Sequence, residues 1–74
     1  MKYTENDLKN IIAICEQENN SNISIPGKLA KRCRDALAYG DAIRLTKYDK
    51  AYLKSMYDKD MDLDCKVTLD KILR

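Results

Sequence analysis

The chain is predicted to be an all-α protein, a compact bundle of about four short helices that ends in a helical hairpin. Three observations carry this prediction. Apolar residues recur three and four positions apart along most of the chain. Hydroxyl residues stand three positions before a carboxylate at the start of two of these stripes. Residues 23–25 alternate as a short edge strand would, but no partner strand is evident in the sequence. Residues 1–74 are predicted to form one domain.

The first helix is expected to begin at Thr4, because a threonine N-cap followed by Asp7 satisfies backbone N–H groups that a new helix leaves bare. It should continue to about residue 17, since the polar run 18–22 reads as a loop. Its apolar stripe consists of Leu8, Ile11, Ile12 and Cys15.

The second helix has a boundary at Ser24 or Ile25, with Pro26 in a favourable position of the first turn. Gly40 is the expected end, because glycine accepts the left-handed conformation of a helix C-cap. The apolar side comprises Leu29, Cys33, Ala36 and Leu37. Residues 41–45 then form a connector.

The third helix should run from about 47 to 58, after a capping box formed by Thr46 and Asp49. Its apolar stripe is Tyr48, Tyr52, Leu53 and Met56. The fourth helix is predicted to follow Asp64 as N-cap, with the stripe Cys65, Leu69, Ile72 and Leu73. The predicted core is Leu8, Ile11, Ile12, Leu29, Cys33, Leu37, Ile43, Leu45, Tyr52, Leu53, Met56, Leu69 and Ile72.

The three cysteines are predicted to be small buried hydrophobes. Their odd number and wide spacing argue against a disulfide framework, and a zinc site would need all three thiols plus a carboxylate, because the chain has no histidine. Alternating aspartates at 58, 60, 62 and 64 begin like a calcium loop, but Leu63 stands where glycine is needed and Leu69 where a bidentate glutamate is needed. We therefore expect neither a metal nor another cofactor.

An enzyme is disfavoured. The chain has no glycine-rich phosphate loop and no nucleophile beside an identifiable base, and its two glycines are isolated at Gly27 and Gly40. A chain of 74 residues also buries too little surface to enclose a substrate easily. A binding module is the simpler expectation.

The charge of the chain is concentrated in its middle. Residues 1–25 carry two basic and four acidic side chains, residues 26–54 carry eight and three, and residues 55–74 carry four and five. A segment with this excess of basic residues is typical of a surface that binds phosphate groups. An ordinary solvent-exposed helix face has the same composition. The predicted nucleic-acid contacts are Lys28, Lys31, Arg32, Arg34, Arg44, Lys47, Lys50 and Lys54. Tyr57, and also Tyr39, are candidates to stack on a base, or else they cap the edge of the core.

Residues 45–73 resemble the short tails of phage and plasmid DNA-processing proteins. The similar features are the helix starts Leu45-Thr46 and Leu63-Asp64 and the aromatic-leucine pair Tyr52-Leu53. With its size and its Lys/Asn/Ile/Asp-rich composition, the whole chain is similar to the small proteins encoded beside the UvsW helicase of T-even bacteriophages. The resemblance implies a role in phage recombination, replication or repair through single-stranded nucleic acid or the helicase.

The leading hypothesis is a non-enzymatic accessory protein that binds single-stranded DNA or RNA through backbone charge and works with a DNA helicase. The alternative is a protein-interaction module that docks on a helicase or host factor without touching nucleic acid. A helix-turn-helix repressor ranks third, because the first loop is long and polar. No membrane span or secretory signal is seen, so we expect the chain in the cytoplasm, that of the host cell if it is phage-encoded. We also expect a monomer.

Overall fold

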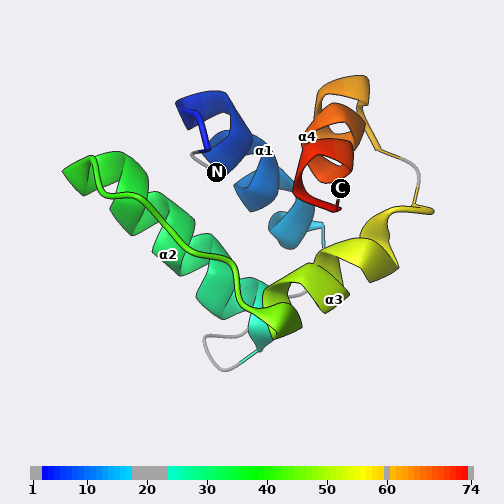
Figure 1. Ribbon diagram of the computed structural model, residues 1–74, viewed down its shortest axis with the longest axis horizontal. Coiled ribbons are helices and arrows are strands. Elements are labelled where there is room, and N and C mark those ends of the chain that lie inside the picture. Colours follow the sequence, from blue (N-terminus) through cyan, green and yellow to red (C-terminus); the bar gives the residue numbers. More distant parts are fainter. Residues whose placement is uncertain (1–2, 18–23, 60, 74) are drawn as a thin grey trace.

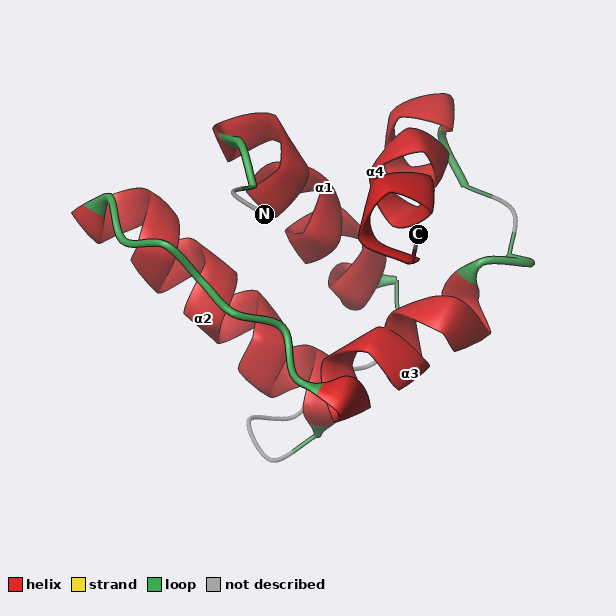
Figure 2. Cartoon of the chain, viewed as in Figure 1, coloured by secondary structure: helices red, strands yellow, loops and turns green. Residues whose placement is uncertain are grey.

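The computed structural model describes residues 3–17, 24–59 and 61–73, and these form a helical protein as predicted. The helices are α1 (Glu5–Glu16), α2 (Ile25–Tyr39), α3 (Lys47–Met56) and α4 (Leu63–Leu73). Figure 1 shows α1 between α2 and α4, while α3 crosses the end of α2 and runs toward α4. Loops join the helices, and the described residues contain no strand (Figure 2).

Both predicted capping boxes are present. The Thr4 hydroxyl accepts a hydrogen bond from the Asp7 N–H at 3.1 Å, and the Asp7 carboxylate accepts one from the Thr4 N–H at 2.9 Å. Thr46 and Asp49 repeat this exchange at 3.2 and 2.9 Å at the start of α3. Each pair satisfies two donors that a helix start leaves without partners, so the local sequence is sufficient to place these two starts.

The limits of α2 are also as predicted. The Ser24 hydroxyl accepts from the Gly27 N–H at 3.1 Å, Pro26 lies in the first turn, and Gly40 closes the helix at φ +71°. Ile25 is helical, which contradicts the edge-strand alternative at that residue. The predicted loop at 18–22 and the other strand residue, Ile23, lie outside the described residues.

Two helix limits differ from the prediction. Helix α3 ends at Met56, two residues before the expected end at Asp58. Helix α4 begins at Leu63, and the Asp62 carbonyl accepts the first helical hydrogen bond from the Lys66 N–H at 3.1 Å. Asp62 therefore occupies the cap position predicted for Asp64. Both aspartates suit that position, so local chemistry does not choose between them.

One hydrophobic cluster joins all four helices and the connector. Its buried members are Leu8, Ile11, Ile14, Cys15, Leu29, Ala30, Cys33, Ala36, Leu45, Leu53, Met56, Cys65, Leu69 and Ile72. Four predicted core residues are only partly buried at its edge: Ile12, Leu37, Ile43 and Tyr52. Ile14 was missed because α1 packs against both α2 and α4, and its buried surface is wider than a single stripe.

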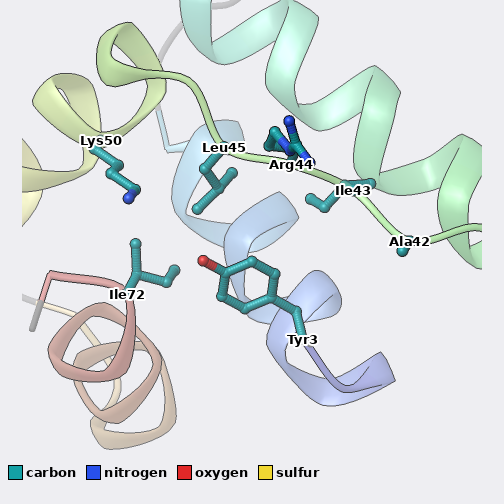
Figure 3. A pocket seen from close by; sticks show the side chains of 7 residues that line it. All are labelled: Tyr3, Ala42, Ile43, Arg44, Leu45, Lys50 and Ile72. Carbon is teal, nitrogen blue, oxygen red and sulfur yellow. The ribbon is translucent and has the colours of Figure 1, made fainter. Parts of the chain in front are cut away.

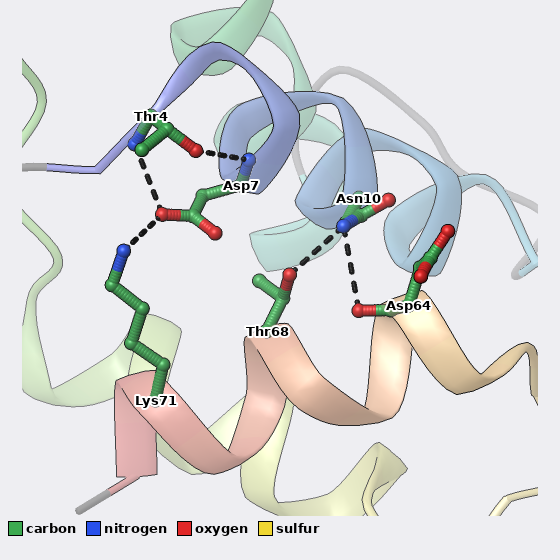
Figure 4. Close-up of polar contacts among 6 residues, drawn as sticks. All are labelled: Thr4, Asp7, Asn10, Asp64, Thr68 and Lys71. Atoms are coloured by element: carbon green, nitrogen blue, oxygen red, sulfur yellow. Dashed lines mark hydrogen bonds and ion pairs between the residues drawn. The ribbon is translucent and has the colours of Figure 1, made fainter.

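Polar contacts fix α4 against α1, as Figure 4 shows. The Asn10 side chain donates to the Thr68 hydroxyl at 2.9 Å, and the Lys71 ammonium lies 2.5 Å from the Asp7 carboxylate. Helix α4 also contacts α3, its neighbour in the predicted hairpin. The C-terminal helix thus closes the bundle by packing on the first.

Candidate functional site

Arg32 joins the two basic segments that the sequence predicts. Its guanidinium donates to the Asp49 carboxylate at 2.9 Å and to the Arg44 carbonyl at 2.7 Å. One side chain of α2 thereby holds both the connector and the first turn of α3. The basic residues of α2, the connector and α3 consequently lie on adjoining segments of the fold.

Asp49 is the buried partner of Arg32, with a side chain that is 5% exposed. Burial alone would raise the pKa of its carboxyl. The hydrogen bonds from Arg32 and Thr46, together with the positive charge of Arg32, outweigh burial, so the pKa lies below the ordinary value of 3.8. Asp49 is therefore ionised at neutral pH and neutralises the charge of Arg32.

Arg34 has a partner on another helix. Its guanidinium lies 2.6 Å from the Glu16 carboxylate at the end of α1, and both side chains are exposed. Arg32 and Arg34 thus already hold the fold together through ion pairs. Contact of either residue with nucleic acid stays a prediction, and the contact would compete with these pairs.

The other predicted cations have no acidic partner among the described residues. Lys28, Lys31, Arg44, Lys50 and Lys54 are exposed, and no described residue forms an ion pair with them. The ammonium of Lys47 lies 5.3 Å from the centre of the Tyr48 ring, within range of a cation–π contact. Asp35, one turn after Lys31, is an exposed carboxylate among the cations of α2. It reduces the positive charge of that helix face without removing it.

Of the two tyrosines predicted to stack on a base, Tyr39 is exposed, whereas Tyr57 already has partners within the protein. The Tyr57 hydroxyl donates to Asp70 at 2.5 Å, and the Lys66 ammonium lies 4.9 Å from its ring centre and donates to its carbonyl. Such a ring is poorly placed for a base, and its stacking on a base stays a prediction. Tyr39 is 77% exposed and Tyr48 is 62% exposed.

Tyr48 was assigned to the apolar stripe of α3, and this assignment is wrong. Asp49 takes the inward position instead, four residues before the buried Leu53. The capping box in the sequence could have predicted this burial. The Asp49 carboxylate accepts a hydrogen bond at the start of its own helix, so its burial costs little free energy.

An open cleft of about 510 Å³ lies where the connector passes α1, α3 and α4. Its lining is Tyr3, Ala42, Ile43, Arg44, Leu45, Lys50 and Ile72 (Figure 3). Two of these residues are cations and none is a carboxylate. Arg44 and Lys50 are among the predicted contacts, but no pattern in the sequence points to Tyr3, which precedes the first helix.

A second cleft, of about 340 Å³, has mixed charge. Its lining is Lys54, Tyr57, Asp58, Asp70 and Leu73. Two carboxylates oppose one ammonium there, so this cleft does not favour an anion. Lys54 is therefore less favourably placed for phosphate than Lys50.

All three cysteines are buried, as predicted. Burial is the main cause that raises the pKa of Cys15 to about 12 and that of Cys33 to about 11, and it raises the pKa of Cys65 as well. Within the described ranges, no group of three potential ligands is close enough to hold a metal ion. None of the described helices is long and apolar enough to cross a membrane.

No protein-family model matches the chain, and neither does any curated protein or solved structure.

Proposed function

We propose that the chain is a non-enzymatic accessory protein that binds single-stranded nucleic acid. The contacts are the exposed cations of α2, the connector and α3, here called the basic surface: Lys28, Lys31, Arg44, Lys47, Lys50 and Lys54. The observation that carries the proposal is the double contact of Arg32 with Asp49 and Arg44, which brings these segments together. Cations on adjoining segments suit the closely spaced phosphates of one strand.

Exposed tyrosines favour a single strand over a duplex. Tyr48 lies in the first turn of α3 beside Lys47, and Tyr39 ends α2. Unpaired bases stack on such rings with a gain of about 1 to 3 kcal/mol per base and with little sequence preference, whereas the bases of a duplex already stack on one another.

The resemblance to proteins encoded beside the UvsW helicase extends the proposal to a biological setting. We place the chain in phage DNA recombination, replication or repair, where it keeps a strand available to a DNA helicase. It acts there as a monomer in the host cell cytoplasm.

The test is binding of a labelled, unstructured oligonucleotide at about 50 mM and about 200 mM salt. The logarithm of the association constant should fall with the logarithm of salt by about 0.7 for each phosphate contact. The double variant Lys31→Glu/Lys47→Glu should bind much more weakly and with a shallower salt dependence. Neither residue takes part in an ion pair with a described residue, so the fold should persist.

The matched control is Lys9→Glu/Lys59→Glu, which changes the net charge equally at exposed positions outside the basic surface. It should keep most of the affinity. Equal losses in the two double variants would show that net charge alone governs binding and would overturn the assignment of the basic surface.

A protein-interaction module remains the second candidate, and one observation favours it. Leu63 and Val67, one turn apart on α4, are 77% and 58% exposed. Neighbouring exposed apolar side chains are typical of docking surfaces. If this candidate is correct, purified helicase should retain the chain after nuclease treatment, and Leu63→Lys/Val67→Lys should release it. Release by nuclease alone would instead favour nucleic-acid binding.

A further inference from the structure

The cleft between Tyr3 and Lys50 is assembled from four separate parts of the chain. Tyr3 precedes α1, Ile43 and Leu45 come from the connector, and Ile72 comes from α4, while Lys50 belongs to α3. Figure 3 shows the Tyr3 hydroxyl and the Lys50 ammonium directed into the space from opposite sides. We call this space the Tyr3–Lys50 cleft.

The lining of the Tyr3–Lys50 cleft divides into an apolar part and a polar part. Ile43, Leu45 and Ile72 supply hydrocarbon, and the ring of Tyr3 adds an aromatic surface (Figure 3). Among the described residues, none forms a hydrogen bond or ion pair with the Lys50 ammonium or the Tyr3 hydroxyl. These donors are therefore available to a ligand that is anionic at one end and apolar or flat at the other.

A volume of about 510 Å³ is within the range of pockets that hold small molecules. The cleft has two cations at its lining, Lys50 and Arg44, and no carboxylate. A phosphomonoester carries a charge of about −1.5 to −2 at neutral pH, and the phosphodiester inside a strand carries only about −1. Two cations therefore match a monoester better than a diester.

We propose that the Tyr3–Lys50 cleft binds a nucleotide through a terminal phosphomonoester, either as a free mononucleotide or as the phosphorylated end of a strand. Lys50 holds the phosphate, Arg44 adds positive charge at the edge of the cleft, and the base lies against Tyr3, Ile43 and Ile72. The proposal rests on the proposed function for its ligand class and adds a discrete site for one nucleotide to the extended basic surface.

Amide chemical shifts of isotope-labelled protein test this site, with thymidine monophosphate, thymidine and inorganic phosphate titrated separately. Thymidine monophosphate should shift the amides of Ile43, Leu45 and Ile72 and saturate at the lowest concentration of the three ligands. Unperturbed amides around the cleft would overturn the proposal. Equal affinities for inorganic phosphate and the nucleotide would overturn the nucleotide class.

Lys50→Gln should weaken nucleotide binding by about tenfold or more, because a charged hydrogen-bond donor to the phosphate is lost. Lys59→Gln is the matched control, since Lys59 lies three residues after the end of the same helix, is exposed and lines neither cleft. It should bind the nucleotide as the unaltered protein does. If Lys50→Gln also binds unchanged, the site is wrong.

Competition distinguishes the two sources of the phosphomonoester. An oligonucleotide with a terminal phosphate that displaces the nucleotide more strongly than its terminal-hydroxyl counterpart assigns the cleft to strand ends. Displacement by neither oligonucleotide, with the cleft amides still shifted by the nucleotide, assigns it to free mononucleotides. Both of these outcomes support the cleft, whereas equal displacement by the two oligonucleotides would show that internal phosphodiesters occupy it and would overturn recognition of a terminal phosphate.

Failure of the site and failure of the proposed function give different results. If oligonucleotide binding depends on Lys31 and Lys47 while the cleft amides do not respond to thymidine monophosphate, the cleft alone is wrong. If the nucleotide binds in the cleft and the oligonucleotide shows no salt-dependent affinity, the proposed function alone is wrong.

Discussion

A single arginine shows how one residue serves the fold while its neighbours remain available for binding. Arg32 uses its guanidinium on Asp49 and on the Arg44 carbonyl, and Lys28 and Lys31 beside it stay exposed. The residue type alone does not reveal this division. All three are cations on one helix, and only the position of α3 gives Arg32 a buried partner.

Replacing Arg32 should destabilise the protein far more than replacing Arg34. Arg32→Ala leaves the buried Asp49 carboxylate without its charged partner, which should cost about 1.5 to 3 kcal/mol of unfolding free energy. Arg34→Ala removes an exposed pair with Glu16, worth about 0.2 to 1 kcal/mol. Urea unfolding of both variants measures the difference. Equal losses would mean that burial of Asp49 does not determine the strength of the contact.

The thiols should be unreactive in the native protein. Cys15 and Cys33 have pKa values of about 12 and 11 because burial disfavours the thiolate, which is the reactive form. At pH 8 a chromogenic disulfide reagent should modify the folded protein slowly and the urea-unfolded protein rapidly. Rapid modification of both states at the same rate would contradict the buried placement.

Among the elements, α1 and α3 begin with the same device. Asp7 and Asp49 each accept the N-cap N–H of their own helix and also pair with a cation from another helix, Lys71 or Arg32. Each carboxylate thus stabilises a helix start and a tertiary contact together. The sequence predicts the hydrogen bonds at the helix start, whereas the ion pair depends on which helices pack side by side.

Stability should fall at acid pH because of these two carboxylates. Burial alone would raise the pKa of Asp7, but its bonds to Lys71 and Thr4 outweigh burial, and the pKa of Asp49 is lowered in the same way. A lowered pKa in the folded state contributes stability that is present above the unfolded value of 3.8 and is lost as pH falls through the folded value.

Unfolding free energy measured by urea from pH 6 down to pH 2 should therefore be level at first and then decline below about pH 4. Asp7→Asn/Asp49→Asn should start lower and decline less. Asp35→Asn, at an exposed carboxylate, is the control and should keep the full decline. If the double variant declines as steeply as the unaltered protein, other groups cause the acid sensitivity.

On the scale of the whole molecule, one small core holds every helix. Leu53 and Leu69 are fully buried on different helices within the same cluster. A chain of 74 residues has only a narrow margin of stability, so each of these side chains accounts for a large share of it.

Leu53→Ala should lower the unfolding free energy by about 2 to 5 kcal/mol, because it opens a cavity in a core that cannot collapse freely. Leu63→Ala is the matched control, since Leu63 is 77% exposed, and it should change stability by no more than about 0.5 kcal/mol. Thermal and urea unfolding measure both. A small loss for Leu53→Ala would show that the core repacks around the gap.

The sequence by itself determined where three of the helices begin and where α2 ends. The bonds at Thr4, Ser24, Thr46 and Gly40 join residues at most four apart, so tertiary neighbours are not needed to specify them. The same reasoning failed at Asp64, because Asp62 is an equally suitable residue type for the cap position, and its carbonyl accepts the first helical hydrogen bond.

Only the tertiary structure decided which cations are paired and which remain open. Arg32 and Asp49 are 17 residues apart, and Tyr3 and Ile72 lie near opposite ends of the chain, yet the first two form an ion pair and the last two line one cleft. Contacts at such separations depend on how the helices pack around a shared core. Residue type and helical spacing indicate on which face of its own helix a side chain lies. They do not indicate which surface of another segment packs against that face.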